Sequence, residues 1–381
     1  MKIVCAASVL FAKEAFETLG ETVVIPDRLI GPDDLRQADA LIVRSKTNVD
    51  QRLLARSHVG FVGTATAGYD HIDIDYLRER DIAWCAAPGC NANSVAEYVV
   101  TALCCLANRH HLTLDRRVLG VIGCGQVGSR VVEKTRSLGM NALRNDPPLE
   151  IATEDSGFVS IEDVLHQADA ITLHVPLTKS GQFPTYRMVD SHFFEHLKPG
   201  CIFLNTARGE IVDSEMLLFA LHHGAPAHAV LDVWQSEPFL SEQLIEKVDL
   251  ATPHIAGYSF EGRLGGTAAV YREACNFFEI QPKWTPNEGL FPKSAEITLD
   301  ARGKSDESVL YEAARAAYEI EGDDKALRQG SKTDDAARAS HFDMLRRQYP
   351  DRREFTAVRV KLLNATTIQA KKLAGLGFRV S

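Results

Sequence analysis

The chain has 381 residues, 45% of them hydrophobic and 24% charged, a composition typical of a globular protein with two or three domains. Its 51 Asp and Glu outnumber its 42 Lys and Arg, so the net charge points neither to nucleic acid nor to an anionic membrane as a partner. We expect a cytoplasmic protein, because the sequence shows no signal-peptide pattern, no apolar run of membrane-spanning length and only scattered cysteines that favour reduced thiols.

Short apolar runs alternate with helical patterns over the first hundred residues. Strands are predicted at 2–5, 40–43, 59–63 and 83–86, and helices at 12–19 and 74–80. This alternation favours a parallel sheet covered by helices. Asn93 is predicted to cap a long apolar helix over residues 94–108.

A second alternating series follows, and it is typical of a doubly wound nucleotide-binding domain. Its predicted strands are at 117–122, 141–144, 170–174, 201–205, 229–233 and 248–251, and a helix follows at 261–278. Turn residues at 282–289 predict a linker. The charged remainder predicts a small capping or oligomerisation domain, in which the run 346–354 is interpreted as a solvated face or an interface because acids and arginines interleave.

Residues Gly123–Gly128 form a GxGxxG sequence between a predicted strand and a predicted helix. Gly123 allows the tight turn, Gly125 lets a pyrophosphate approach the backbone, and Gly128 lets the helix pack on the strand. Asp146 ends the next strand, where a carboxylate accepts hydrogen bonds from ribose hydroxyls and repels a 2′-phosphate. The sequence therefore predicts NAD as cofactor, with Gln126 and Val127 in the binding loop; a glycine turn without ligand is the alternative.

Three later polar residues each follow a predicted strand: Arg208, Glu237 and His254. Open parallel sheets bind their ligands at the carboxyl ends of strands, so these side chains are expected at one edge. A histidine held by a carboxylate is suited to remove a hydroxyl proton near neutral pH. The planar fork of an arginine suits a substrate carboxylate. Taken singly, each residue has a structural explanation; their order after a nucleotide-binding loop favours catalysis.

The glycine loop and the segments around these three residues resemble the D-isomer-specific 2-hydroxyacid dehydrogenase family over about residues 1–280. The resemblance implies that Arg208 binds substrate, that Glu237 raises the basicity of His254, and that His254 is the acid/base. It also implies an α/β fold: two Rossmann-like doubly wound parallel-sheet domains plus a small α+β C-terminal domain. Further cofactor-binding residues implied in this way are Val175, Thr206, Ala207, Asp232 and Gly257.

Segments 43–45, 61–68, 86–92, 254–258 and 342–355 resemble a more particular member of that family. This implies the oxidation of 4-phospho-D-erythronate to 2-oxo-3-hydroxy-4-phosphobutanoate, a step towards pyridoxal 5′-phosphate, by a homodimer. It implies a substrate-binding lid domain (1–93 and 258–281), an NAD-binding domain (94–257) and a C-terminal dimerisation domain (286–381). The substrate-binding residues are expected to be Arg44, Ser45, Thr66, Ala67, Gly68 and Tyr258.

Two departures and three alternatives accompany this interpretation. Residues 5–9 lack the expected acidic and polar side chains, and Val175 stands where a threonine is usual. The alternatives are another D-2-hydroxyacid dehydrogenase, for example of 3-phosphoglycerate, an NAD-sensing corepressor, and a dinucleotide-binding domain without catalysis. The histidines of 192–196 fit an inverted zinc-protease pattern but are interpreted as part of an amphipathic surface helix, and no metal is expected. The histidine pairs at 110–111 and 222–223 indicate no site.

Overall fold

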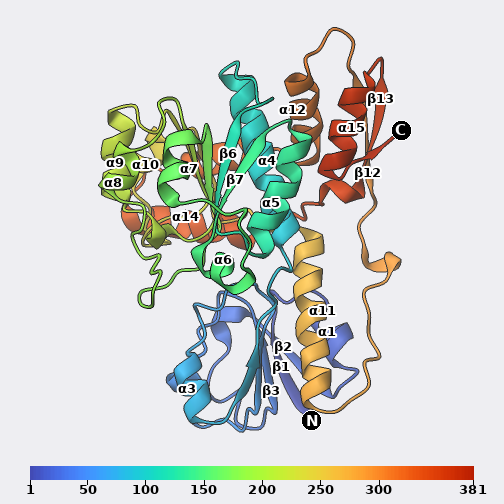
Figure 1. Cartoon of the computed structure of the whole chain (residues 1–381). Coiled ribbons are helices and arrows are strands. Elements are labelled where there is room, and N and C mark those ends of the chain that lie inside the picture. Colours follow the sequence, from blue (N-terminus) through green and yellow to red (C-terminus); the bar gives the residue numbers. More distant parts are fainter. The chain divides into compact units, whose positions relative to one another are not determined.

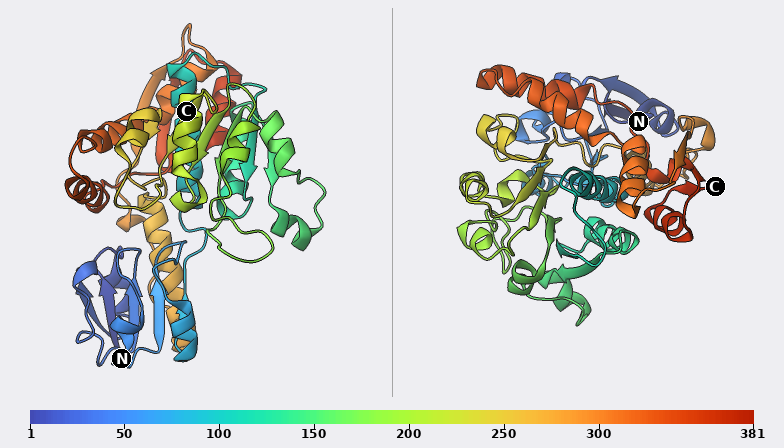
Figure 2. Two further views of the ribbon diagram at one scale, coloured as in Figure 1. Left: turned by 90° about the vertical axis from the view of Figure 1, so that its left-hand side faces the viewer. Right: turned by 90° about the horizontal axis from the view of Figure 1, so that it is seen from above.

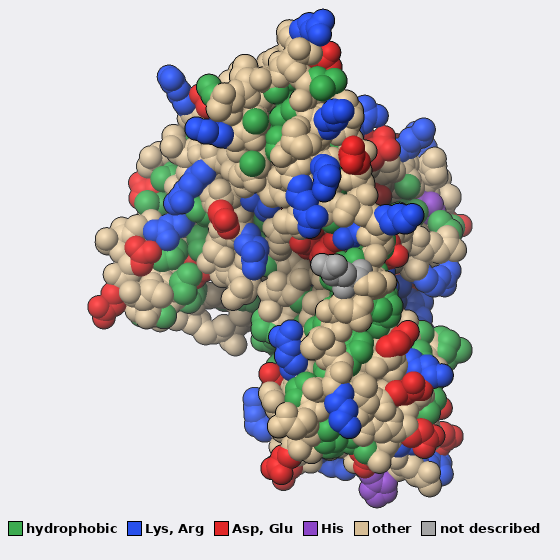
Figure 3. All heavy atoms as spheres, turned by 90° about the vertical axis from the view of Figure 1, so that its right-hand side faces the viewer, with side chains coloured by type: hydrophobic (Ala, Val, Ile, Leu, Met, Phe, Trp, Pro, Cys, Tyr) green, Lys and Arg blue, Asp and Glu red, His purple; other side chains and the backbone are tan. Residues whose placement is uncertain are grey.

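The computed structural model describes residues 1–381, except for the side chain of Glu288. Contacts divide the chain into two compact units. The first comprises Met1–Ala92 and Ser259–Lys293, and the second comprises Asn93–Tyr258 and Ser294–Ser381. Both are built from parallel strands and helices (Figures 1 and 2), which confirms the predicted α/β fold class. Among the described residues, no helix is both long and apolar enough to cross a membrane. Acidic and basic side chains are interspersed over the face shown in Figure 3.

The first unit is a five-stranded parallel sheet in the order β2-β1-β3-β4-β5. Its strands are β1 (Lys2–Ala6), β2 (Glu21–Ile25), β3 (Ala40–Val43), β4 (Phe61–Thr64) and β5 (Ala83–Cys85). Its helices are α1 (Ala12–Phe16), η1 (Asp27–Leu29), α2 (Gln51–Leu54), α3 (Ile74–Glu79), α11 (Phe260–Phe277) and η3 (Glu288–Leu290). The strand order reverses between β1 and β3, and ligands bind at such a switch point in open parallel sheets.

Helix α11 belongs to the first unit although it follows nearly the whole of the nucleotide-binding sequence. A Cβ atom on Gly63 of β4 would overlap the side chain of Val270, and one on Gly266 would lie 2.6 Å from the carbonyl oxygen of Ala65. The helix therefore packs on β4 at distances that only glycine permits. The edge strand β2 was not predicted; all five of its residues are half-buried or exposed.

The second unit contains a six-stranded parallel sheet in the order β11-β10-β9-β8-β6-β7. Its strands are β6 (Val118–Ile122), β7 (Asn141–Asn145), β8 (Ala170–Leu173), β9 (Ile202–Asn205), β10 (His228–Leu231) and β11 (Leu250–Ala251). Its helices are α4 (Ala92–Arg109), α5 (Gln126–Ser137), α6 (Pro147–Thr153), α7 (Ile161–Gln167), α8 (Ser191–Glu195), η2 (Gly209–Ile211), α9 (Ser214–His222) and α10 (Glu242–Lys247). The order reverses between β6 and β8, which makes this the switch point of the second sheet.

Alternation along β6 explains how this sheet is covered on both faces. Leu119 and Val121 belong to the core cluster that includes α4 and α5. A Cβ atom on Gly120 would overlap Val164 of α7, so Gly120 faces the opposite layer. Successive residues of a strand point to opposite faces. Figure 1 shows α4 and α5 on one side of the sheet and α7 to α10 on the other.

The C-terminal segment of the second unit adds a three-stranded parallel sheet in the order β12-β13-β14. Its elements are β12 (Ala295–Asp300), α12 (Asp306–Ala317), α13 (Ile320–Gln329), α14 (Asp335–Arg347), η4 (Phe355–Ala357), β13 (Val358–Leu363), α15 (Thr367–Leu376) and β14 (Arg379–Val380). Helix α15 packs on α5, where Lys134 Nζ donates a 2.6 Å hydrogen bond to the carbonyl oxygen of Leu376.

One local prediction was wrong, and another was narrowed. Helix α4 begins at Ala92, so Asn93 is not its cap; its side-chain amide instead donates hydrogen bonds to Glu97 at 2.9 Å and to Glu354 at 2.6 Å. The run 346–354 was interpreted as a solvated face or an interface, and two of its residues pack inside the chain: Glu354 is 8% exposed and the Arg346 side chain 13%. The contact between Asn93 and Glu354 spans 261 residues of sequence.

Candidate active site

The glycine loop lies at the switch point between β6 and β8. Gly123 has φ +86°, and a Cβ there would lie 2.6 Å from the backbone carbon of His174 and 2.7 Å from the nitrogen of Val175. A Cβ on Gly128 would overlap the carbonyl oxygen of Gly123, so only glycine fits at this position in the first turn of α5. The site of a Cβ on Gly125 has nothing within 4 Å. The loop thus leaves open space at the N-terminus of the twelve-residue helix α5, where backbone N–H groups attract phosphate.

Asp146 lies beside this loop, as predicted for a ribose-binding carboxylate. Its Oδ2 accepts a 2.8 Å hydrogen bond from the backbone N–H of Cys124, and its Oδ1 caps α6 by accepting from Leu149 N at 3.1 Å. A carboxylate offers about four acceptor positions, so capacity for ribose hydroxyls remains. Gln126 and Val127 occupy the first turn of α5. The carboxylate therefore has a second role that was not predicted: it ties the glycine loop to the end of β7.

The ends of β8 and β9 complete this edge of the sheet. His174 follows β8, and its Nδ1 lies 3.3 Å from Thr206 Oγ1, while its Nε2 lies 3.0 Å from Thr172 Oγ1. Burial lowers the pKa of His174 to about 3, so this histidine is neutral. The backbone of Val175, the next residue, lies close to Gly123. Ala207 follows β9 and is buried. His174 was not predicted; its place directly after a strand was the available signal.

Glu237 and His254 form the centre of the candidate site. His254 Nδ1 and Glu237 Oε2 are 2.8 Å apart, and Glu237 Oε1 accepts a 2.9 Å hydrogen bond from the N–H of Trp234. Burial raises the pKa of Glu237, but the charge of His254 and its hydrogen bond, followed by Arg346 and the Trp234 N–H, hold that pKa below its usual value. An ionised carboxylate only accepts, so Nδ1 carries the proton and Nε2 is available for chemistry.

Asp232 supports the loop that carries His254. Its carboxylate accepts hydrogen bonds from the N–H groups of Ile255 and Ala256, both at 2.8 Å, and from Thr252 Oγ1 at 2.6 Å. These bonds hold the loop in which His254 has φ +55°, a left-handed conformation that a histidine rarely adopts. Asp232 was predicted to contact the cofactor, and this stays a prediction. In this structure the residue is 1% exposed and its carboxylate holds the loop that carries His254.

Arg208 reaches the same edge through an adjacent loop. It precedes η2, and its guanidinium donates a 2.7 Å hydrogen bond to the carbonyl oxygen of Ala207. A Cβ on Gly209 would overlap the backbone of Trp234 and Gln235, so the Arg208 loop lies directly against the Glu237 loop. The structure therefore brings the loops of Arg208, Glu237 and His254 together at the carboxyl ends of β9, β10 and β11. Gly257 lies in the following turn, closed by Tyr258 N donating to Ile255 O at 2.8 Å.

The predicted substrate residues of the first unit lie at the carboxyl ends of β3 and β4. Arg44 is 9% exposed and follows β3, whereas Ser45 is exposed. Thr66 Oγ1 donates to the carbonyl oxygen of Gly68 at 2.8 Å, and the half-buried Ala67 lies between them. The strands are neighbours in register, so these loops share one edge of the sheet. Tyr258, the remaining predicted substrate residue, belongs to the second unit.

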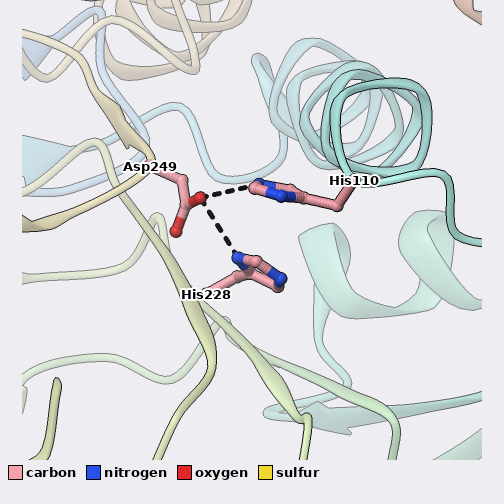
Figure 4. Close-up of side chains that lie close together, drawn as sticks. All are labelled: His110, His228 and Asp249. Carbon is pink, nitrogen blue, oxygen red and sulfur yellow. Dashed lines mark hydrogen bonds and ion pairs between the residues drawn. The ribbon is translucent and has the colours of Figure 1, made fainter. Parts of the chain in front are cut away.

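A second group of histidines and a carboxylate was not predicted (Figure 4). His110 Nε2 and His228 Nδ1 lie 2.9 and 3.1 Å from the same Oδ1 atom of Asp249, and the two rings are in contact, with centroids 3.8 Å apart and planes tilted by 30°. Asp249 Oδ2 accepts a 3.0 Å hydrogen bond from Ala229 N. Both histidine nitrogens are directed at one oxygen rather than at a common vacant point, which is the geometry of hydrogen bonding. The group joins the end of α4 to β10 and β11.

Comparisons with known proteins agree with this geometry. Residues 104–256 match the family described as D-isomer specific 2-hydroxyacid dehydrogenase, NAD binding domain, and residues 290–377 match a domain of unknown function, DUF3410. The chain is 40% identical over 381 residues to the erythronate-4-phosphate dehydrogenase of Proteus mirabilis, with all of both chains covered. It is 42% identical over 364 residues to the enzyme of that name from Salinibacter ruber, covering 93% of this chain and 92% of the relative.

Among solved structures, the chain is similar to an NAD⁺-bound 3-phosphoglycerate dehydrogenase from Entamoeba histolytica, at 27% identity and a TM-score of 0.63. That alignment covers 76% of this chain and 99% of the other, so about a quarter of this chain has no counterpart there. A D-lactate dehydrogenase from Aquifex aeolicus, at 24% identity and a TM-score of 0.60, shares the fold. By its similarity over the whole length and its strand-end motifs, the chain belongs to the erythronate-4-phosphate dehydrogenases, within the D-isomer specific 2-hydroxyacid dehydrogenase family.

Proposed function

We propose that this chain is an NAD-dependent enzyme that oxidises C2 of 4-phospho-D-erythronate to 2-oxo-3-hydroxy-4-phosphobutanoate, a step towards pyridoxal 5′-phosphate. The observation that carries the proposal is the 2.8 Å pair of Glu237 and His254 at the same sheet edge as the glycine loop. The substrate assignment is supported by relatives at 40–42% identity that are named for it and match along nearly their whole length.

The residues present fit NAD. The open position over Gly125 and the N-terminus of α5 suit the pyrophosphate, and Asp146 beside the loop suits the adenosine ribose. Val175, Thr206, Ala207, Asp232 and Gly257, at or after the ends of β8 to β11, would line the remainder of the cofactor. When bound, NAD supplies the acceptor for the hydride that leaves C2.

The protein's own residues manage the proton and the substrate charge. His254 takes the C2 hydroxyl proton on Nε2, while Glu237 stabilises the imidazolium that results. Arg208 binds the substrate carboxylate and polarises the C2 oxygen, because its planar fork matches a carboxylate. In the reverse direction His254 returns the proton to the carbonyl oxygen. The 2.8 Å hydrogen bond to Glu237 keeps the imidazole in the tautomer this requires.

Arg44, Ser45, Thr66, Ala67 and Gly68 would bind the remaining groups of the substrate, with Tyr258 donating its hydroxyl. Arg44 is suited to bind an anion because its positive charge is buried and therefore acts strongly on neighbouring groups. The thiol of Cys90 shows this effect. Burial raises the pKa of Cys90 to about 11, and the charge of Arg44 acts against that rise. We assign residues 1–93 and 258–281 to a substrate-binding lid and residues 94–257 to NAD binding.

We further propose that the protein is a cytoplasmic homodimer whose residues 286–381 form the dimer interface. All eight cysteines are free thiols, as a reducing compartment requires. Light scattering after size exclusion tests the assembly: a mass twice the 42.0 kDa of the chain is expected, and a monomer at micromolar concentration would refute it.

The activity is tested by following NADH formation with the purified full chain, NAD and a panel of acids. The panel contains 4-phospho-D-erythronate, non-phosphorylated erythronate, 3-phosphoglycerate and D-lactate. We expect the highest kcat/KM for the phosphorylated four-carbon acid. Higher turnover of 3-phosphoglycerate or lactate would replace the substrate assignment. NAD binding without turnover of any acid would indicate a cofactor-sensing protein instead of an enzyme.

A further inference from the structure

Arg346 brings a positive charge from the C-terminal segment to the candidate active site. It lies in the last turn of α14, and its Nη1 is 4.0 Å from Glu237 Oε2. The guanidinium carbon lies 5.9 Å from the ring centre of Tyr258 and 5.5 Å from that of Phe342, which is fully buried. The Arg346 side chain is only 13% exposed. Arg346, which lies 109 positions after Glu237 in the sequence, is therefore close to the Glu237 carboxylate.

Helix α14 is fixed on the loop that carries Glu237. Arg338 lies in the first turn of α14 and is 7% exposed. Its Nε donates a 2.8 Å hydrogen bond to the carbonyl oxygen of Leu240. Its Nη1 donates to Ser331 O and Thr333 O at 2.8 and 2.7 Å. Helix α14 thus meets the Glu237 loop at two points: Arg338 is hydrogen-bonded to Leu240, and Arg346 lies 4.0 Å from the Glu237 carboxylate.

The polar atoms of Arg346 are not fully used by folding. Its Nε is buried and, within the described part of the chain, has no hydrogen-bond partner. Buried donors without partners are rare in native proteins and carry an energetic cost. Such a cost is commonly retained where a charge serves the active site. A leucine or methionine would fill this apolar contact with Phe342 without that cost.

The charged and titratable groups that act on Arg346 come from the loops after two strands. Glu237 and Asp232 follow β10, and Tyr258 and His254 follow β11. Burial lowers the pKa of Arg346, but Tyr258, Glu237 and Asp232 together outweigh it and raise that pKa, so the guanidinium stays charged. Burial raises the pKa of Glu237, and Arg346 is one of the groups that lower it, after the charge and hydrogen bond of His254.

We propose that Arg346 is a positioning residue of the active site, which holds the Glu237 carboxylate and the Tyr258 hydroxyl in place and moderates how strongly Glu237 stabilises the protonated His254. The proposal deepens the proposed function and rests on it for its kinetic consequences. It makes the C-terminal segment part of the catalytic apparatus. A carboxylate shared between a histidine and an arginine keeps its geometry while its effect on the histidine is reduced.

The sign of the effect follows from Coulomb's law. Without the positive charge of Arg346, Glu237 attracts the imidazolium more strongly, so His254 stays protonated to higher pH. The neutral form of His254, which the oxidation requires as the base, then forms only at higher pH. The acid limb of kcat/KM should move to higher pH by about half a unit or more, and kcat at neutral pH should fall about threefold or more.

The test compares Arg346→Met, Arg346→Lys and the matched control Arg347→Met, since Arg347 is exposed on the same turn. For each variant kcat and KM are measured from pH 6 to 10. Arg346→Met should shift the limb and lower kcat, Arg346→Lys should keep the wild-type midpoint with a smaller loss of kcat, and Arg347→Met should match wild type. A loss confined to KM, or a wild-type profile in Arg346→Met, would overturn the proposal.

A second readout separates this proposal from the substrate assignment. The ring signals of His254 are titrated by NMR in the absence of any acid, with His254→Ala used for the resonance assignment and NAD binding used as the check of folding. Arg346→Met should move the titration midpoint of His254 to higher pH whatever the substrate is. If Arg346→Met does not bind NAD, the titration of His254 is measured in Arg346→Lys instead, which keeps the positive charge. A titration midpoint of His254 that differs from wild type in a folded Arg346→Lys would contradict the proposal.

Discussion

Two histidine–carboxylate groups lie at opposite ends of the same pair of strands. Glu237 and His254 follow the carboxyl ends of β10 and β11, whereas His228 begins β10 and Asp249 precedes β11. Both groups have hydrogen bonds of about the same length, 2.8 Å in the first and 2.9–3.1 Å in the second. Residue type and distance therefore do not distinguish a catalytic group from a structural one.

The difference lies in where each group stands in the sheet. The carboxylate of Asp249 is shared by two histidines and a backbone N–H at the amino ends of β10 and β11 (Figure 4). His254 lies past the carboxyl ends of these strands, where its Nδ1 is bonded to Glu237 and where the hydrogen bonds of Asp232 hold its loop in a left-handed conformation. Ligands of open parallel sheets bind at the carboxyl ends of the strands. The position in the sheet therefore favours catalysis at Glu237 and His254.

The largest expected effect breaks this comparison directly. Replacing His254 by Ala should lower kcat by roughly 10²-fold or more, because the general base is lost. Replacing His228 by Ala should leave kcat within a factor of about two of wild type, because its group lies at the other edge of the sheet. Steady-state assays of the two variants at pH 7–8 are the measurement. Equal losses in the two variants would show that the positions are not functionally different.

The next effect concerns the support of the catalytic loop. Asp232→Asn removes the charge that accepts from Thr252, Ile255 and Ala256, and an amide oxygen cannot replace both carboxylate oxygens. We expect a loss of about 2–3 kcal/mol in the free energy of unfolding together with a lower kcat. Urea denaturation and steady-state kinetics measure the two quantities. A fully active and fully stable variant would disprove the supporting role.

A smaller effect concerns the choice of cofactor at the same edge. Asp146→Ser should lower kcat/KM for NAD by about tenfold, through the lost charge-assisted hydrogen bonds, and should improve the relative use of NADP. Because Asp146 also accepts from Cys124 N at 2.8 Å, the melting temperature is measured alongside. An unchanged ratio of NAD to NADP efficiency would refute the ribose assignment.

The smallest effect is expected at the amino edge. Burial raises the pKa of Asp249, but His228, the Ala229 N–H and His110 outweigh it and hold the pKa below its usual value. The depressed pKa stabilises the fold above about pH 4, and this contribution is lost as the pH falls through the folded-state value. Asp249→Asn should cost about 1 kcal/mol at pH 7 and progressively less below pH 4 in urea denaturation. A cost independent of pH would contradict this account.

The sequence predicted much of this site because its signals are local. The glycine loop, Asp146 and the polar residues after β9, β10 and β11 each lie within a few residues of a strand end, and the parallel sheet brings strand ends together. The structure adds a contact that no local pattern predicts: Gly209 packs against the backbone of Trp234, so two of these loops touch. Local periodicity also located ten of the eleven strands of the two larger sheets, missing only the half-exposed β2.

What the sequence could not predict depends on distant contacts. Asn93 was interpreted as a cap because caps are local, yet its amide bonds Glu354 across 261 residues. The run that contains Arg346 was interpreted as a solvated face or an interface because acids and arginines interleave, and this pattern does not say that α14 places Arg346 near Glu237. The roles of Asp232 and Asp249 also required the fold, because Asp232 is bonded to the loop after β11 and Asp249 to His110 at the end of α4.

The central claim is that the Glu237–His254 edge oxidises C2 of a phosphorylated hydroxy acid with NAD. It is tested most directly with 4-phospho-D-erythronate that carries deuterium at C2, by measuring the isotope in the reduced cofactor by mass spectrometry. We predict that every molecule of NADH formed by the wild-type chain carries one deuterium, and that His254→Ala forms the same labelled product at roughly 10⁻² of the rate or less. Reduced cofactor without deuterium, or undiminished formation by His254→Ala, would contradict the account.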